Sequence, residues 1–260
     1  MSGMSTECLH EVLAIAAHPD DVEFTCGGTL ISLADKGKKT AILDLTAGER
    51  GTLGDPVTRL KEADAAAKLM GITTRRCAHL PDTAIANTTE QRLVVAQHVR
   101  DLRPDTVILP HWVQRHPDHL ATCEMGADAC FFAGMKNIDL KGEPFRPNRI
   151  VYVSYFNNHD HSFVVDIAAT FERKMAAIAC YASQFAGTTP LSDSLDALKH
   201  IKPDLKPDPN FIFQPGVSVY EQTLLIARLT GISANVAVAE GYSVKRGIVL
   251  DDFTHVAVGR

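Results

Sequence analysis

The sequence lacks several features that would place the protein in a membrane, on nucleic acid or outside the cell. No apolar run in its 260 residues approaches the roughly 20 residues that a membrane helix needs. The first residues, MSGMSTECLHEV, contain no basic region followed by an apolar stretch, so we expect no signal peptide. The net charge is −5 and no block of like charges occurs, which argues against binding to a phosphate backbone. We therefore expect no membrane and no nucleic acid among its partners.

Cysteine is also scarce, and its spacing suggests no disulfide framework. The six cysteines are scattered along the chain and none forms a C-x-x-C pair. Scattered free thiols are typical of a reducing compartment, where disulfides rarely persist. We therefore expect a cytoplasmic protein.

Apolar strand-like runs alternate with helix-like stretches over most of the chain. We expect strands at 12–17, 40–45, 76–80, 106–109 and 150–156, and helices at 30–36, 59–70, 89–102 and 119–132. Uninterrupted apolar strands that alternate with helices indicate an α/β fold of the Rossmann-like class, in which a mostly parallel sheet carries helices on both faces.

The regularity weakens after about residue 157. Here we expect a strand at 162–167, helices at 171–181 and 220–229, a final strand-like stretch, and a loop at KPDLKPDPN (202–210). The simplest organisation is a single domain over 1–260, with a core at about 10–157 and a C-terminal elaboration at about 158–260.

Polar residues follow the first expected strand directly, in the stretch AAHPDDVEFTCGGTL (16–30). Ligands of an open parallel sheet gather at the carboxyl ends of its strands. Polar groups at the end of a buried strand are costly unless they have partners, and a cation is the simplest shared partner. His18 and Asp21 are spaced to converge on one ion, which leaves Asp20 free. Alternatively, Asp20 or Asp21 caps a helix that begins near Val22.

A second polar cluster, LPHWVQRHPDHLATCE (109–124), also follows an expected strand. It offers His111, His116, Asp118 and His119, which should emerge at the same edge of the sheet. A helix cap at Asp118 is the alternative for that residue, but it does not explain the flanking histidines. Spacing alone does not rank the three histidines as ligands.

Together the two clusters supply three protein ligands for a metal ion. A carboxylate and an imidazole remain that are not needed as ligands. Three ligands with an open position are typical of a catalytic zinc site, whereas a structural site is closed by four. We therefore predict one Zn²⁺ per chain, although a site of nitrogen and oxygen ligands also accepts other divalent ions.

These motifs resemble the LmbE-like (PIG-L) zinc-dependent deacetylases, which remove acetyl groups from N-acetylglucosamine units. The resemblance rests on AHPDDVEFTCGGTL and HPDH, and extends over roughly 12–250 through LTAGERGT (45–52), TRLKEADAAAKLMGI (58–72) and LPD (80–82). Two further stretches, FERKMAAIACYASQF (171–185) and VAVAEGYSVKR (236–246), resemble the branch that deacetylates N-acetylglucosaminyl malate in bacillithiol biosynthesis.

The resemblance implies a division of roles within the two clusters. It makes His18, Asp21 and His119 the zinc ligands and Asp20 the general base. It makes His116 a second catalytic group, which Asp118 orients.

The resemblance also implies that Glu49 holds sugar hydroxyls and that Arg59 holds a carboxylate or the departing acetate. The alternative for Arg59 is an exposed ion pair with Glu62 or Asp64 on one helix, which would contribute little.

The expected activity is therefore hydrolysis of the acetamide of a small amino-sugar conjugate, with N-acetylglucosaminyl malate as the first candidate. The alternatives are an amidase of bacillithiol- or mycothiol-type conjugates, a deacetylase of another N-acetylated amino sugar, and a non-catalytic metal-binding protein. We also expect a homo-oligomer, since the stretch 171–185 could supply an apolar face. The same face could equally belong to the core of the protomer.

Overall fold

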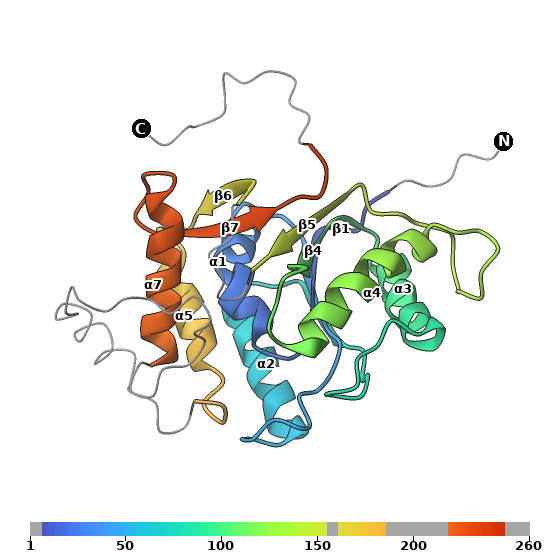
Figure 1. Ribbon diagram of the computed structural model, residues 1–260, viewed down its shortest axis with the longest axis horizontal. Coiled ribbons are helices and arrows are strands. Elements are labelled where there is room, and N and C mark those ends of the chain that lie inside the picture. Colours follow the sequence, from blue (N-terminus) through green and yellow to red (C-terminus); the bar gives the residue numbers. More distant parts are fainter. Residues whose placement is uncertain (1–6, 155–160, 186–217, 248–260) are drawn as a thin grey trace.

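The computed structural model describes residues 7–154, 161–185 and 218–247, which form a seven-stranded sheet flanked by helices (Figure 1). The strand order is β3-β2-β1-β4-β5-β7-β6. The first five strands in that order are parallel, and β7 runs antiparallel to both β5 and β6. The predicted α/β class is confirmed. The strands are β1 (His10–Ala16), β2 (Thr40–Asp44), β3 (Thr74–Cys77), β4 (Pro104–Pro110), β5 (Arg149–Val153), β6 (Phe163–Asp166) and β7 (Ala239–Ser243).

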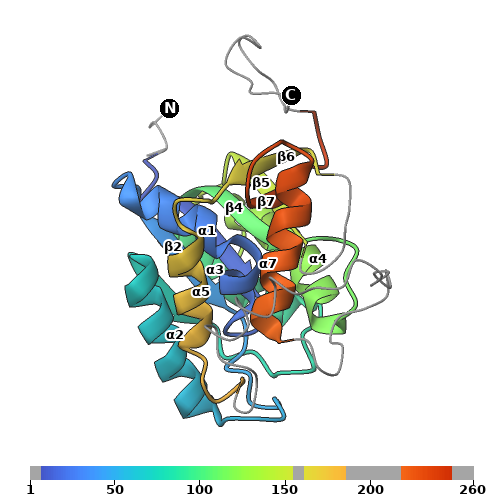
Figure 2. The same cartoon turned by 90° about the vertical axis from the view of Figure 1, so that its left-hand side faces the viewer.

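Helices cover both faces of the sheet (Figures 1 and 2). Alternate residues of β1 point to opposite faces: Leu13 and Ile15 join one core cluster, and Ala14 and Ala16 join the other. The first cluster packs against α3 (Thr89–Leu102) and α4 (Pro117–Ala133). The second packs against α1 (Asp21–Asp35), α2 (Pro56–Met70) and α5 (Phe171–Ala179). The last described helix, α7 (Val219–Ile232), packs against β6 and β7 through Leu224 and Ala227.

Two elements differ from the expected boundaries. Helix α1 begins at Asp21 rather than near residue 30, which agrees with the alternative of a helix that begins near Val22, although Asp20 makes no capping hydrogen bond. The helix contains a kink at Cys26, whose φ of −137° is not helical. The expected strand at 76–80 lies at Thr74–Cys77, where it pairs in register with β2. The loop predicted at 202–210 lies outside the described residues.

The sheet has a topological switch point between β1 and β4. Strands β2 and β3 lie on one side of β1, whereas β5 and β7 lie beyond β4 on the other side. Chains that leave the carboxyl ends of β1 and β4 therefore diverge, and such a crevice is where α/β sheets bind ligands. The two polar clusters of the sequence follow these two strands. No helix in the described part of the chain is long and apolar enough to cross a membrane.

Candidate active site

The turn between β1 and α1 sends two neighbouring carboxylates in different directions. Asp20 lies at the N-cap position of α1 with a φ of 102°, a strained backbone conformation for a residue other than glycine. Its side chain accepts no capping hydrogen bond, and its Oδ2 lies 3.3 Å from Arg59 Nη2. The carboxylate of Asp21 instead accepts a hydrogen bond from the backbone N–H of His18 at 2.9 Å. The two carboxylates therefore have different partners: Asp20 faces Arg59, whereas Asp21 is bonded to His18.

Three predicted ligands meet at one point on the switch edge. Asp21 Oδ2 lies 3.5 Å from His18 Nδ1 and 3.2 Å from His119 Nε2. Ligand atoms about 2.1 Å from a tetrahedral zinc ion lie about 3.4 Å from one another. The side chains of His18, Asp21 and His119 therefore fit the donor set and spacing of a zinc site, and the three come from two segments far apart in the chain.

A second group of possible ligands, His18, His116 and Asp118, shares His18 with the first. The second nitrogen of His18, Nε2, lies 3.3 Å from Asp118 Oδ2 and 3.2 Å from Asp82 Oδ1. Histidines that bind metals ordinarily give their other ring N–H to a carboxylate. The first group permits this arrangement, with Nδ1 toward the metal and Nε2 toward Asp82 and Asp118. The first group therefore fits the usual surroundings of a metal-bound histidine.

His116 borders the metal position from the start of α4. Its ring centre lies 4.9 Å from that of His18 and 5.0 Å from that of His119. His116 Nδ1 accepts a hydrogen bond from the backbone N–H of Asp118 at 3.2 Å, which makes His116 the N-cap of the helix. The Asp118 carboxylate accepts from the backbone N–H of Thr83 at 2.8 Å and faces His18. The backbone of Asp118 holds His116, and its side chain holds His18.

Carboxylates dominate the electrostatics of the site. Burial alone lowers the pKa of His18, but hydrogen bonds with Asp118, Asp21 and Asp82 outweigh it and raise that pKa to about 12. Burial raises the pKa of Asp20 to about 8, with repulsion from Asp21 adding to the shift and Arg59 opposing it. Such crowding of negative charge around one imidazole favours a bound cation at this position.

Burial lowers the pKa of His116, and the neighbouring His119 and His18 lower it further. The neutral form of His116 is thereby favoured next to the cation site.

Arg59 is buried, with 4% of its surface exposed. Its Nη1 donates to the Gly48 carbonyl at 2.9 Å and its Nη2 to the Pro19 carbonyl at 2.8 Å. Gly48 has a φ of +66°, and a Cβ at that position would overlap the guanidinium. The alternative of an exposed helix pair is therefore wrong, and the guanidinium braces the turn that carries Asp20.

Glu49 lies on the exposed rim of the site, where its Oε1 accepts from the backbone N–H of Asp82 at 2.7 Å. Asp82 itself is 4% exposed and accepts from the backbone N–H of Arg50 at 2.8 Å. No role was predicted for Asp82 from the sequence, although Asp82 follows the parallel strand β3 at the same carboxyl edge of the sheet. The rule that located the other clusters could have found it.

His111, which spacing could not separate from the other histidines, belongs to neither possible ligand group among the described residues. Its ring stacks on Trp112 with centres 3.9 Å apart, and its Nδ1 accepts from the backbone N–H of Val113 at 3.0 Å. His111 thus contacts Trp112 and the backbone of Val113 and is not a member of either possible ligand group.

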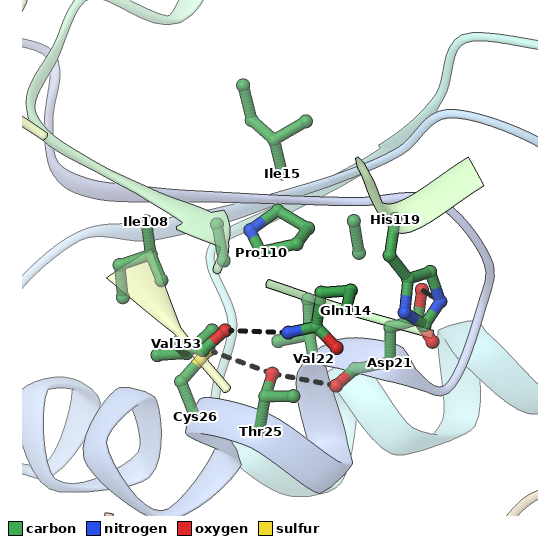
Figure 3. A pocket seen from close by; sticks show the side chains of 12 residues that line it. Ile15, Asp21, Val22, Thr25, Cys26, Ile108, Pro110, Gln114, His119 and Val153 are labelled. Atoms are coloured by element: carbon green, nitrogen blue, oxygen red, sulfur yellow. Dashed lines mark hydrogen bonds and ion pairs between the residues drawn. The ribbon is translucent and has the colours of Figure 1, made fainter. Parts of the chain in front are cut away.

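A pocket opens beside two of the predicted ligands (Figure 3). Asp21 and His119 lie at one end of it, Cys26, Ile108 and Val153 lie at the other, and Gln114 lies between. Gln114 Nε2 donates to the Val153 carbonyl at 3.5 Å. The site thus combines a cation position with an adjoining, mainly apolar space.

A Rossmann-like sheet with a His–Asp–His set at its switch point defines an α/β protein with side chains that could hold a divalent metal. Residues 13–130 match the family PIG-L: GlcNAc-PI de-N-acetylase. A diacetylchitobiose deacetylase of Thermococcus kodakarensis is 32% identical over 67% of this chain and 70% of its own. The chain belongs to the PIG-L/LmbE-like deacetylase family.

Further relatives agree with this membership. A probable N-acetyl-alpha-D-glucosaminyl L-malate deacetylase 2 of Bacillus anthracis is 29% identical over 67% of this chain and 81% of its own. Among solved structures, a conserved protein of Thermus thermophilus is 31% identical, with a TM-score of 0.78 over 95% of this chain and 100% of its own. An N,N'-diacetylchitobiose deacetylase of Pyrococcus horikoshii is 25% identical, with a TM-score of 0.72 over 95% of this chain and 86% of its own.

Proposed function

We propose that this protein is a zinc-dependent hydrolase that removes the acetyl group from an N-acetylglucosamine conjugate. The observation that carries the proposal is the meeting of His18, Asp21 and His119 around one point, with His116 beside it. Asp20 is close enough for the charges of Asp21 and His18 to influence its pKa. The names of the relatives support the reaction, since they include deacetylases of N-acetylglucosamine-containing compounds.

His18, Asp21 and His119 would hold the zinc ion. When bound, the ion would polarise the acetamide carbonyl and lower the pKa of water toward neutrality. His18 stays oriented because Asp82 and Asp118 face its outer nitrogen.

Asp20 is the general base of the proposed reaction. Its backbone is held at a strained φ, and Arg59 approaches its Oδ2 at 3.3 Å. A carboxylate fixed beside the ion would take a proton from the attacking water and pass it to the departing sugar amine.

His116 would donate a hydrogen bond to the acetamide oxygen as negative charge develops there. Its ring lies beside both histidine ligands, and the backbone N–H of Asp118 fixes its Nδ1. Removing one such donor typically costs ~10²–10³ in rate.

The group attached to the sugar has two candidates. The sequence resemblance favours malate, and the Bacillus anthracis relative supports it. The Thermococcus and Pyrococcus deacetylases favour a second amino sugar in its place, as in diacetylchitobiose. Glu49 would bind the sugar hydroxyls, and its exposure on the rim supports this role. The proposed partners are such a small molecule and further copies of this chain, in a cytoplasmic setting.

Zinc content and activity measured together test the proposal. We expect His18→Ala and His119→Ala to lose both, Asp20→Asn to lose activity with its zinc kept, and His116→Ala to keep zinc while turnover falls ~10²–10³-fold. His98→Gln on α3 is the control, which should change neither. Equal zinc loss in all four variants, or near-native turnover by His116→Ala, would contradict the assigned roles.

Substrate identity is tested by measuring the free amine released from N-acetylglucosaminyl malate, from diacetylchitobiose and from amides of thiol conjugates. Cleavage of the thiol-conjugate amides alone would replace the deacetylase with the amidase alternative.

A further inference from the structure

The loop between β4 and α4 carries both His116 and the sole tryptophan of the chain. The strand ends at Pro110 and the helix begins at Pro117, so residues 111–116 connect them. Trp112 is the second residue of this loop, and His116 is its last, where it caps α4. Because the chain between them is short, whatever fixes Trp112 also limits the positions open to His116.

The register of the sheet places the start of this loop and the end of β7 beside one side chain. Tyr152 of β5 pairs with Leu109 of β4 and, on its other side, with Ser243 of β7 (Figure 1). Trp112 comes shortly after Leu109 in the chain, and Lys245 comes shortly after Ser243. Both segments therefore leave the sheet from the neighbours of Tyr152, which is 4% exposed and belongs to the core.

Trp112 packs against two buried rings and a cation. Its ring stacks on that of His111 with centres 3.9 Å apart, and it meets Tyr152 edge-on at 5.0 Å. Lys245 Nζ lies over both aromatic side chains, 5.3 Å from the ring centre of Trp112 and 4.9 Å from that of Tyr152. An ammonium at this range is attracted by the negative faces of the rings. The indole, which is 39% exposed, is thus held on a buried platform of His111 and Tyr152.

The platform is itself tied to the sheet. The backbone N–H of His111 donates to the Val153 carbonyl at 2.8 Å, and its Nδ1 accepts from the backbone N–H of Val113 at 3.0 Å. At the other end of the loop, His116 Nδ1 accepts from the backbone N–H of Asp118 at 3.2 Å. The loop is therefore anchored by the platform at its start and by a helix cap at its end.

We propose that Trp112 and Lys245 form a clamp that holds the β4–α4 loop and thereby positions His116. The inference rests on the proposed function, in which His116 donates a hydrogen bond to the acetamide oxygen. Such a donor is effective only when it is already aimed at the oxygen, and a displacement of about 1 Å can cost ~10²-fold in rate. Trp112 and Lys245 are therefore positioning residues that act through His116.

Tryptophan emission tests the clamp without turnover, because Trp112 is the only tryptophan of the chain. Lys245→Met removes the cation but keeps a long side chain, so the indole should be less firmly held. We expect a red shift of the emission maximum and stronger quenching by acrylamide. Lys245→Arg keeps the cation and should emit as the wild type does. Arg146→Met is the matched control, since the Arg146 guanidinium lies 4.2 Å from the ring centre of Phe131 near the far end of α4.

Kinetics on the zinc-loaded protein test the positioning role. With a conjugate that the wild type deacetylates, we expect Trp112→Leu to lower kcat by about tenfold, with little change in KM and with its zinc kept. Trp112→Phe places an aromatic ring on the platform again and should restore most of the rate. Phe131→Leu is the control, because Phe131 is also an exposed aromatic residue beneath a cation. It should keep the native kcat.

A double-variant cycle distinguishes positioning from a general loss of structure. If Trp112 acts through His116, Trp112→Leu should cause no further loss of kcat in a His116→Ala background. An equal loss in both backgrounds, or an emission spectrum that Lys245→Met leaves unchanged, would overturn the proposal.

The two readouts also separate this inference from the proposed function. If the zinc-loaded wild type releases no amine from any conjugate, the proposed function fails and the positioning role falls with it, whereas the emission spectra still decide whether the clamp exists. If the wild type is active but Trp112→Leu keeps its kcat, the hydrolase stands and the clamp has no part in its reaction.

Discussion

At the scale of single residues, Arg59 shows how the site is held in place. A guanidinium is a rigid fork of five N–H donors, and this one reaches two backbone carbonyls and the Asp20 carboxylate. The carbonyl of Pro19 belongs to the turn that places Asp20 at a φ of 102°. Two nitrogens of Arg59, Nη1 and Nη2, thus donate hydrogen bonds to groups of the protein itself. We infer that Arg59 chiefly positions Asp20, the proposed general base, whereas the sequence resemblance suggested contact with substrate.

The variant Arg59→Lys separates these two roles. Lysine keeps the charge but cannot bridge the same three acceptors, so we expect kcat to fall by about tenfold or more with little change in KM. Steady-state kinetics on the accepted amino sugar would measure both. Arg76→Lys is the control, since Arg76 is 39% exposed and pairs with Asp101 across 3.6 Å. A rise in KM at unchanged kcat would instead show that Arg59 binds substrate.

The meeting of the polar clusters that follow β1 and β4 could be predicted from the sequence, but the outer contacts of their side chains could not. His18, Asp21 and His119 follow strand ends that a parallel sheet must bring together. The family resemblance implied that Asp118 orients His116. In the structure the Asp118 side chain faces His18, since helix α4 turns this carboxylate toward the β1 cluster. Local spacing gives no information on such a contact between segments.

At the scale of elements, helix α1 depends on a residue from the far end of the described chain. The helix is kinked at Cys26, and the N–H groups that follow the kink need acceptors. Glu240 of β7 supplies them, with Oε1 accepting from Gly28 N and Oε2 from Thr29 N, each at 2.8 Å. Lys174 of α5 lies 2.6 Å from Oε1, and both side chains of this ion pair are 2% exposed.

This contact explains why the helical pattern alone indicated only the part of α1 from residue 30, and why the earlier start near Val22 remained an alternative. Two consecutive glycines weaken the helical pattern at 27–28, so only the later part of the helix was expected. The stabilising carboxylate is supplied from β7, which no local pattern can indicate. By contrast α3 was expected with the bounds that it has, because Thr88 caps it and Arg103 ends it locally.

We predict that Glu240→Gln destabilises the protein by about 3–5 kcal/mol. The amide would place N–H donors against the N–H groups of α1 and would leave the buried Lys174 without its counter-charge. Urea unfolding, with the midpoint compared at constant slope, measures the change. Glu11→Gln should stay within about 0.5 kcal/mol, since Glu11 pairs with Lys38 at the exposed surface.

The double variant Lys174→Met, Glu240→Gln should lose less than the sum of the two single changes, because the charges depend on each other. Additive losses, or a Glu240→Gln protein that unfolds at the native midpoint, would contradict this account of the pair.

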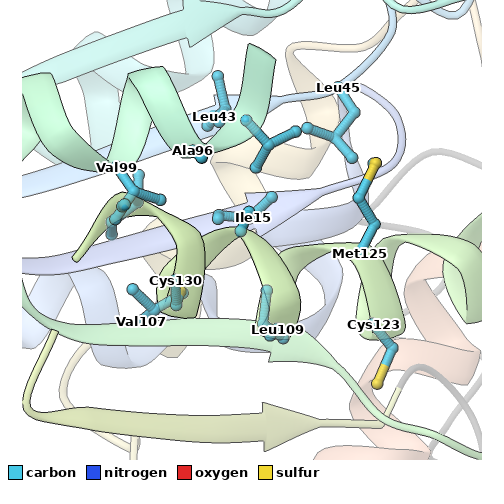
Figure 4. Packing of buried hydrophobic residues seen from close by; sticks show 14 of the residues in the cluster. Ile15, Leu43, Leu45, Ala96, Val99, Val107, Leu109, Cys123, Met125 and Cys130 are labelled. Atoms are coloured by element: carbon cyan, nitrogen blue, oxygen red, sulfur yellow. The ribbon is translucent and has the colours of Figure 1, made fainter. Parts of the chain in front are cut away.

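At the scale of the whole molecule, the parallel part of the sheet could be predicted because its strands are apolar on both faces. Leu43 of β2 and Leu109 of β4 pack with Val99 of α3 and Met125 of α4 in one continuous core (Figure 4). The order of the strands could not be predicted, and neither could the addition of β6 and β7 in antiparallel orientation. Those pairings depend on the path of the chain through segments without a regular pattern.

The proposed metal would link residues that follow two different strands, β1 and β4, so its binding should be measurable as a gain in the stability of the whole fold. His18 and Asp21 follow β1, whereas His119 lies on α4 after β4. A ligand that binds only the folded protein adds about 2.7 kcal/mol when its free concentration is 100 times its Kd. For a chain of this length, such a gain corresponds to a rise in Tm of roughly 5–10 °C.

We therefore expect a chelator to lower the Tm of the purified protein by about that amount, and stoichiometric zinc to restore it. His119→Ala should have a Tm that neither zinc nor chelator changes, because one of its three ligands is missing. His98→Gln should respond as the wild type does. Scanning calorimetry with and without each additive measures these shifts. A His119→Ala protein that zinc stabilises as strongly as the wild type would mean that the ion binds elsewhere, and the roles assigned around His18 would have to be abandoned.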